Sequence, residues 1–327
     1  MRSPAKMDTI QIELTDACTL ACSNCTRNVG HLTPFFITFD EFKKAIDSLN
    51  GFNGIAGFMG GEPTLHPKFA EFCEYALSVR PRELLGLWSV FPDAPKYKAY
   101  APLICKTFGN ILLNDHTLDN IMHGPIHVGI QEVVKDEAEM WQLIDSCWVQ
   151  NSWSASINQR GAYFCEVAAA NALLYPDRPD GWKVEPGWWK RTPKDFKEQM
   201  EASCPSCGCA VPFKRRASVE ERDDISPANL KVLDGRSKRV RDGKFVESKF
   251  EIDQTLDEQT HYYPDQVYKN HQYRQRIADR YGILLVMNSR GYWEPRMKPA
   301  GYKPPSPPPQ GLFHILQERY AGTEAGD

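Results

Sequence analysis

The chain has 327 residues, of which 42% are hydrophobic and 25% charged, and its formal net charge is −3. This composition is that of a globular protein with a full core, and it lacks the basic excess of a dedicated nucleic-acid binder. No apolar run reaches the ~20 residues of a membrane span, and no hydrophobic segment follows residues 1–6, so we expect a cytoplasmic protein. Ten cysteines in such a chain indicate metal ligands or free thiols rather than disulfides.

Strands and helices alternate along the first half of the chain. Alternating residues at 10–14 predict the first strand, and Thr38 with Glu41 forms a capping box that predicts an amphipathic helix through Leu49. The hydrophobic pattern then predicts further strands over 55–59, 85–91, 109–114 and 126–133, a sixth near 149–157, and helices over 67–79, 96–106 and 136–144. Such alternation predicts an α/β fold with a parallel sheet and right-handed crossovers.

Three cysteines follow the first predicted strand at a C-x3-C-x2-C spacing, namely Cys18, Cys22 and Cys25. Thiolates this close together on a tight loop can converge on separate irons of one cubic cluster, and thiolates are the usual protein ligands of such clusters. The next cysteine is Cys73, so one iron of that cluster would lack a protein ligand, as catalytic metal sites do. A zinc site and three free thiols are the alternatives, although structural zinc requires four ligands.

A glycine motif follows the second predicted strand, with the residues Gly60, Gly61, Glu62 and Pro63. Two successive glycines let a backbone approach a ligand closely, and the Glu62 carboxylate can accept hydrogen bonds from an ammonium group. In parallel barrels the chemistry gathers at the carboxyl ends of the strands. Both motifs follow predicted strand ends, so we expect them to share one site.

Together, the cysteine spacing and the glycine motif resemble the signature of the radical SAM superfamily over about residues 8 to 145. The resemblance implies a partial (β/α)6, TIM-like barrel over residues 1–145. It also implies that Cys18, Cys22 and Cys25 hold a [4Fe–4S] cluster with an open iron, and that S-adenosylmethionine (SAM) binds beside the glycine motif. Asn24 departs from the family pattern, which usually has an aromatic residue before the third cysteine.

A second set of cysteines lies behind the predicted barrel, consisting of Cys147, Cys165, Cys204, Cys207 and Cys209. It resembles the twitch or SPASM extension of radical SAM enzymes, which implies a one-cluster auxiliary module over residues 146–212. The resemblance implies Cys147, Cys165, Cys204 and Cys207 as ligands of a second [4Fe–4S] cluster, with Cys209 as the alternative ligand. A structural zinc ion bound by four thiolates would fit the same residues.

The remainder of the chain, residues 213–327, is predicted to be an irregular extension with mixed charge. It includes a helix over 271–280, a strand over 283–287, a proline-rich extended stretch over 298–309 and a last helix over 312–320. Such mixed charge is typical of a solvated surface. We assign no chemistry to this extension from the sequence.

The resemblance implies an enzyme that reductively cleaves SAM to a 5′-deoxyadenosyl radical, which takes a hydrogen atom from a small polar substrate. The electron would come from a low-potential donor such as flavodoxin or ferredoxin. We expect oxidation or epimerisation of a carbohydrate-like or alcohol metabolite in natural-product or glycan biosynthesis. Asn114, His116, Gln131 and Glu132 end the predicted fourth and fifth strands, and Asn114 and Glu132 are the candidates for contact with SAM. The alternatives are a maturase of a ribosomally made peptide, and a non-enzymatic iron–sulfur or zinc protein used in electron transfer or assembly.

Overall fold

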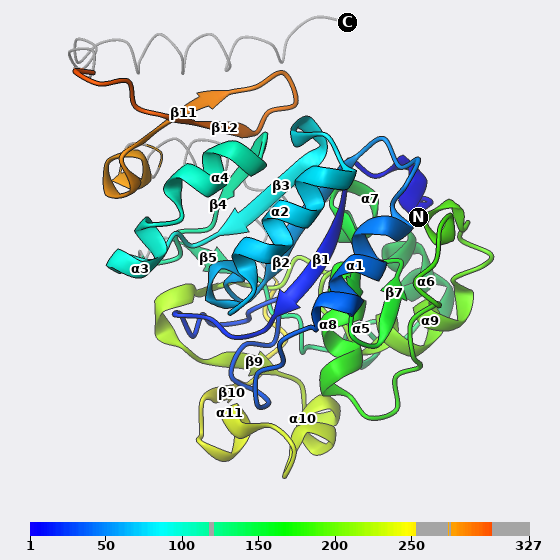
Figure 1. Ribbon diagram of the computed structural model, residues 1–327. Coiled ribbons are helices and arrows are strands. Elements are labelled where there is room, and N and C mark those ends of the chain that lie inside the picture. The colour runs from blue at the N-terminus through cyan, green and yellow to red at the C-terminus, as the bar shows by residue number, and fades with distance from the viewer. Residues whose placement is uncertain (118–120, 253–273, 275, 303–327) are drawn as a thin grey trace, which may run out of the picture. The chain divides into compact units, whose positions relative to one another are not determined.

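An eight-stranded sheet crosses the protein in the order β11-β12-β4-β3-β2-β1-β6-β7 (Figure 1). The computed structural model describes residues 1–117, 121–252, 274 and 276–302. Strands β4, β3, β2, β1 and β6 pair in parallel, whereas β7 and the β11–β12 hairpin pair antiparallel at the two ends. The strands are β1 (Thr9–Thr15), β2 (Ile55–Gly60), β3 (Leu85–Ser89), β4 (Asn110–Leu113), β6 (Ser154–Asn158), β7 (Gly161–Tyr163), β11 (Ile283–Met287) and β12 (Trp293–Met297).

Helices and two small sheets surround this central sheet. The small sheets pair β5 (Met122–His123) with β8 (Arg216–Ala217), and β9 (Asp223–Ile225) with β10 (Phe245–Glu247). The α-helices are α1 (Phe39–Ser48), α2 (Phe69–Val79), α3 (Pro95–Lys98), α4 (Ala101–Thr107), α5 (Ile130–Val133), α6 (Glu137–Asp145), α7 (Trp148–Ser152), α8 (Glu166–Leu174), α9 (Lys197–Ser203), α10 (Pro227–Leu233) and α11 (Lys238–Arg241). The 3-10 helices are η1 (Pro4–Lys6), η2 (Pro63–Leu65), η3 (Arg82–Leu84), η4 (Trp188–Lys190), η5 (Cys204–Ser206) and η6 (Ser218–Glu220).

The capping box predicted at Thr38 begins α1. The Thr38 hydroxyl accepts a hydrogen bond from the Glu41 N–H, and the Glu41 carboxylate accepts one from the Thr38 N–H. This reciprocal pair satisfies two N–H groups that a helix start otherwise leaves unpaired. The helix then buries Phe42, which stacks on Phe72 of α2 with ring centroids 4.2 Å apart. As a result, α1 and α2 lie side by side over one face of β1 and β2 (Figure 1).

Strand β1 is buried on both faces. Ile10, Ile12 and Leu14 pack in the hydrophobic core beneath α1 and α2. The intervening Gln11 and Glu13 are 0% and 1% exposed, so the polar face of the strand is covered as fully as the apolar one. Burial on both faces is typical of a parallel sheet, and it places a carboxyl group in the interior.

The prediction of a strand over residues 126–133 is wrong. Ile126, Val128 and Ile130 are buried as the alternating pattern requires. However, their segment packs against the cysteine-rich region, and its main chain bonds there: the Gly208 N–H donates to Ile126 O and the Ile130 N–H donates to Cys207 O. The segment ends in the short helix α5 rather than continuing the sheet, and the edge of β4 is occupied by β12.

The sixth predicted strand is present as β6, and it pairs in parallel with β1. Thr9 of β1 pairs with Ser154 of β6, and Ile12 pairs with Ile157. The fold is therefore a mixed α/β sheet whose strand order differs from that of an in-order six-stranded barrel.

Residues Met1–Met297 form one compact unit. This unit includes the predicted segments 1–145 and 146–212, and the predicted segment 213–327 as far as Met297. Lys298–Asp327 forms the other unit, of which only 298–302 are described, so the helix predicted over 312–320 and most of the proline-rich stretch lie outside the described residues. Within the described ranges, no helix combines the length and the apolar character needed to cross a bilayer.

Candidate functional site

The cysteine loop and the glycine turn are joined through their backbones. The Gly61 N–H donates to Thr15 O and the Glu62 N–H donates to Ala17 O, each at 2.7 Å. Gly60 has φ +141°, and a Cβ built on it would lie 1.9 Å from Thr15 O. Glycine is therefore required because the turn packs directly against the chain leaving β1, which holds the two motifs together.

Glu62 is fully buried, and its carboxylate is used by its own neighbourhood. Its oxygens accept hydrogen bonds from the Thr64 N–H and hydroxyl, the Ser89 hydroxyl and the Val90 N–H, at 2.6–3.0 Å. Burial raises the pKa of Glu62, and these hydrogen bonds oppose the rise. The carboxylate thus joins the glycine turn to the end of β3. Its contact with a ligand's ammonium group stays a prediction.

A cavity of about 370 Å³ opens at the carboxyl ends of the central strands. Of the predicted site residues, Cys18, Cys22, Cys25, Gly60, Gly61 and Asn114 line it. Glu62, Pro63 and Glu132 are not among the lining residues. Glu132 lies on the helix α5, because the strand predicted to carry it does not form. Its Oε2 accepts a hydrogen bond from the Ala228 N–H.

The three early thiols sit in a largely desolvated environment. Burial raises the pKa of Cys18 to about 12, and the neighbouring Glu62 and Cys25 raise it further against the hydrogen bonds from backbone N–H groups. One of those bonds runs from the Leu20 N–H to Cys18 Sγ at 3.4 Å, and Cys22 Sγ lies 3.9 Å from His116 Nδ1. Such thiols stay protonated until a bound cation stabilises the thiolate.

The second set of cysteines also comes together, around a small apolar cavity of about 30 Å³. Its lining includes Cys147, Cys165, Cys204, Cys207 and Cys209. Burial raises the pKa of Cys147 to about 12, while the hydrogen bond from the Cys209 thiol lowers the pKa of Cys207. All ten cysteines of the chain are free thiols. Among the described residues, no group of three His, Cys, Asp or Glu side chains is arranged to hold a metal ion as it stands.

A buried ion-pair triad connects the two cysteine sets. Arg27 Nη1 lies 2.9 Å from Glu13 Oε1, and Arg27 Nη2 lies 3.2 Å from Glu166 Oε1. Arg27 follows Cys25 by two residues and Glu166 follows Cys165 directly. The triad therefore fixes the early cysteine loop against the start of α8, and Arg27 and Glu166 both line the larger cavity.

Sequence reasoning missed this triad. Its only local signal was a glutamate at position 13, inside a strand that is otherwise covered on both faces. Burial raises the pKa of Glu13 to about 7, although Arg27 and a hydrogen bond from Ser156 act in the opposite direction. Two carboxyl groups thus share one guanidinium in the interior. Because its pKa lies at about 7, Glu13 gains or loses its proton near neutral pH.

No protein-family model and no curated protein sequence matches the chain. Among solved structures, it is similar to BtrN in complex with AdoMet and 2-DOIA, with a TM-score of 0.38 and 15% identity, over 62% of this chain and 92% of that one. A selenomethionine form of BtrN in an open conformation gives a TM-score of 0.36 and 15% identity, over 62% of this chain and 91% of that one. Likeness at this level establishes no function, so the functional assignment rests on the geometry of the described residues.

Proposed function

We propose that the protein is a radical SAM enzyme in which Cys18, Cys22 and Cys25 hold a [4Fe–4S] cluster. The observation that carries this proposal is that the three thiols line one cavity together with Gly60 and Gly61. Backbone hydrogen bonds hold the thiols and the glycines close together, because the glycine turn is bonded to the chain that leads from β1 to Cys18. A random grouping of core cysteines would lack this connection to a ligand-sized cavity.

The donor set suits a cubic cluster. Thiolates are the usual ligands of such clusters, and hydrogen bonds to the sulfurs adjust their potentials. The Leu20 N–H already donates to Cys18 Sγ, and backbone N–H groups of Arg27 and Val29 interact in the same way with Cys25. When bound, the cluster would supply the electron that cleaves the sulfonium C–S bond of SAM, which would release methionine and a 5′-deoxyadenosyl radical. That radical would take a hydrogen atom from the substrate.

The cavity would bind SAM beside the cluster. Its volume of about 370 Å³ falls in the usual range for small-molecule sites. The Gly60–Gly61 turn presents backbone rather than side chain to this space, and we assign the methionyl group of SAM to it. Asn114 and Asp115 line the cavity after β4, and we assign the nucleoside to that side. The buried walls would keep water from the reacting groups.

We propose a second [4Fe–4S] cluster held by Cys147, Cys165, Cys204 and Cys207. The convergence of these thiols on one cavity supports a shared metal group, and structural zinc is the alternative occupant. We interpret Cys209 as a hydrogen-bond donor to Cys207 rather than as a ligand. Because Cys209 lines both cavities, the second site adjoins the space where a substrate would bind.

We further propose that the substrate is a small polar molecule, such as an alcohol or a carbohydrate-like metabolite, that is oxidised or epimerised. The polar side chains Arg27, Glu166 and His123 line the cavity together with Trp148 and Trp153. Such a lining can hydrogen-bond to hydroxyl groups and pack against the carbon skeleton. In an oxidation, a metal cluster next to the substrate would accept the second electron.

The experiment is to reconstitute the full chain anaerobically with iron and sulfide, add dithionite and SAM, and measure 5′-deoxyadenosine. We expect the wild-type protein to form 5′-deoxyadenosine and to hold about eight irons, as two cubic clusters require. Cys22→Ala should abolish SAM cleavage and lose the first cluster only. Cys105→Ser, which changes a half-buried cysteine outside both cavities, should retain both clusters and activity.

Two results would change this assignment. Wild-type protein that holds no iron, or Cys22→Ala protein that still cleaves SAM, would contradict the first site. About four irons with one zinc ion would assign the second cysteine set to structural zinc while leaving the first site intact.

A further inference from the structure

The segment over residues 216–244 packs onto the early cysteine loop, at the carboxyl ends of the central strands (Figure 1). The Ser23 N–H donates to Ser218 O at 2.9 Å, and the Lys238 N–H donates to His31 O at 2.7 Å. We call residues 216–244 the clasp. The loop that carries Cys22 and Cys25 is therefore held from outside the cysteine motif itself.

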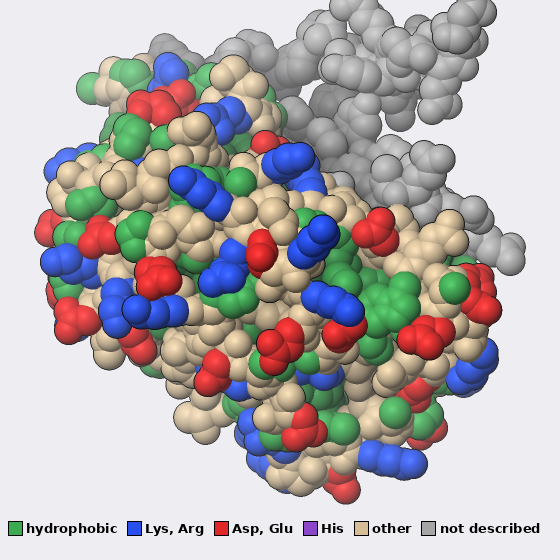
Figure 2. Space-filling view, turned by 90° about the vertical axis from the view of Figure 1, so that its right-hand side faces the viewer, with side chains coloured by type: hydrophobic (Ala, Val, Ile, Leu, Met, Phe, Trp, Pro, Cys, Tyr) green, Lys and Arg blue, Asp and Glu red, His purple; other side chains and the backbone are tan. Residues whose placement is uncertain are grey.

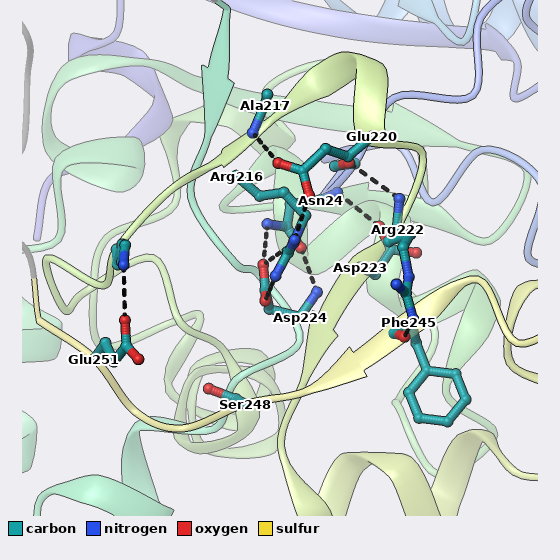
Figure 3. Close-up of polar contacts among 12 residues, drawn as sticks. Asn24, Arg216, Ala217, Glu220, Arg222, Asp223, Asp224, Phe245, Ser248 and Glu251 are labelled. Atoms are coloured by element: carbon teal, nitrogen blue, oxygen red, sulfur yellow. Dashed lines mark hydrogen bonds and ion pairs between the residues drawn. The ribbon is translucent and has the colours of Figure 1, made fainter. Parts of the chain in front are cut away.

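Asn24 is the centre of this contact (Figure 3). It is 1% exposed with φ +49°, its N–H donates to Asp223 Oδ1 at 2.6 Å, and its Nδ2 donates to Asp224 Oδ2 at 2.9 Å. In return, the Asp224 N–H donates to Asn24 Oδ1 at 2.8 Å. Arg216 holds the Asp224 carboxylate through two hydrogen bonds of 2.7 and 3.0 Å. The small amide at position 24 is thus matched to the clasp, which accounts for the absence of an aromatic residue there.

Asp223 joins Asn24 to a buried arginine. Its Oδ2 lies 2.7 Å from Arg239 Nε and 3.1 Å from His31 Nε2. Burial acts to raise the pKa of Asp223, but the hydrogen bond from His31 and the charge of Arg239 outweigh it, so the pKa lies below its ordinary value. The carboxylate is therefore charged, and it fixes Arg239 in position.

The Arg239 guanidinium spans the cysteine loop. Its Nη1 donates to Ala21 O at 3.2 Å and to Val29 O at 3.3 Å, on either side of Cys22 and Cys25. The side chain is 6% exposed, and its Nη2 has no hydrogen-bond partner among the described residues. The positive charge of Arg239 acts to lower the pKa of both Cys22 and Cys25, against the larger effect of burial. The guanidinium is thus a permanent cation beside two proposed cluster ligands.

We propose that Arg239 is a positioning residue that also sets the reduction potential of the cluster on Cys18, Cys22 and Cys25. This inference rests on the proposed function. A fixed cation next to a cluster stabilises the more negative, reduced state, because net charge and hydrogen bonds around the sulfurs set its potential. Asp223 has the opposite charge, so it moderates the effect of Arg239 while it holds the side chain.

The test is a redox titration of the anaerobically reconstituted full chain, followed by EPR spectroscopy. The signal that changes on addition of SAM identifies the open-iron cluster, and the second cluster serves as an internal reference. Arg239→Gln should lower the potential, reducing the ratio of reduced to oxidised cluster at a fixed potential about tenfold, or about 59 mV for a one-electron couple. Asp223→Asn should raise the potential, and Arg239→Lys should restore most of the wild-type value.

Shifts of the reduction potential in opposite directions in Arg239→Gln and Asp223→Asn indicate an electrostatic role. A purely structural role would shift both potentials in the same direction, because either variant would loosen the loop. Arg241→Gln on the same helix is the control, because Arg241 is exposed and, within the described part of the chain, its guanidinium donates to Gly235 O and Arg236 O in the turn before α11. Equal-sign shifts for Arg239→Gln and Asp223→Asn, or an unchanged potential in Arg239→Gln, would overturn the inference. Wild-type protein without an iron–sulfur signal would instead overturn the proposed function.

Discussion

Replacing Glu13 by glutamine should change how the stability of the protein depends on pH. Burial raises the pKa of Glu13 from 4.5 to about 7 in the folded protein, so the folded state holds a proton that the unfolded chain releases. The contribution of Glu13 to the free energy of unfolding therefore falls as pH rises from about 4.5 to about 7, and it levels off above that. At about 1.36 kcal/mol for each pH unit in this window, ionising Glu13 costs about 3 kcal/mol.

Glutamine resembles the protonated carboxyl group and cannot ionise, and it leaves Arg27 paired with Glu166 alone. The free energy of unfolding should therefore depend less on pH in Glu13→Gln, by about 2 kcal/mol between pH 5.5 and pH 8. Urea denaturation of the full chain at both pH values, with the cysteines kept reduced, measures this difference. Glu74→Gln changes an exposed carboxylate of α2 and is the matched control. An identical pH dependence in Glu13→Gln and wild type would refute the reasoning, because it would mean that Glu13 is ionised throughout.

Three further variants test the site and its support. Gly61→Ala would place a Cβ 2.3 Å from Ala17 O, so SAM binding measured by equilibrium dialysis should be lost; binding within twofold of wild type would contradict the close packing. Cys204→Ala should lose about four irons, whereas Cys209→Ala should lose none; equal losses by iron analysis would make Cys209 a ligand. Arg80→Ala should destabilise the fold by at least about 3 kcal/mol in urea denaturation, because four backbone carbonyls lose their buried donor; a change below 1 kcal/mol would show that water replaces it.

Local signals predicted the elements whose ends are set by neighbouring residues. The Thr38 capping box placed the start of α1, and the run of aliphatic residues at 283–287 predicted β11 with the same bounds that the structure has. In both cases the deciding contacts lie within a few residues or follow from a periodic pattern. The helix over 67–79 was likewise found as α2, beginning two residues later.

Pairing between distant segments could not be predicted in this way. The alternation of Ile126, Val128 and Ile130 predicts that these side chains are buried, but it does not report what covers them. In the structure the intervening His127 is buried as well. Here the cover is the cysteine-rich region, so the segment leaves the sheet. In the same way, the pattern over 149–157 predicted a strand, but its position beside β1 depends on a pairing between residues far apart in sequence.

The sequence predicted only the part of the candidate site that depends on local spacing. Cysteine spacing indicated two groups of thiols, and the structure gathers each group around a cavity. The ion pair of Arg27 with Glu166 and the contacts of Asn24 with Asp223 and Asp224 join residues more than a hundred positions apart, so they leave no local pattern. The face drawn in Figure 2 gives little guidance either, since basic and acidic side chains are interspersed over it.

The central claim is that three early thiols hold a cluster with one iron open to SAM. Its most direct test is the EPR spectrum of the dithionite-reduced full chain before and after SAM is added. We predict that SAM changes the g values of one cluster signal, that Cys22→Ala lacks this signal, and that the signal of the second cluster persists. A spectrum that SAM leaves unchanged in the iron-replete wild-type protein would contradict the account.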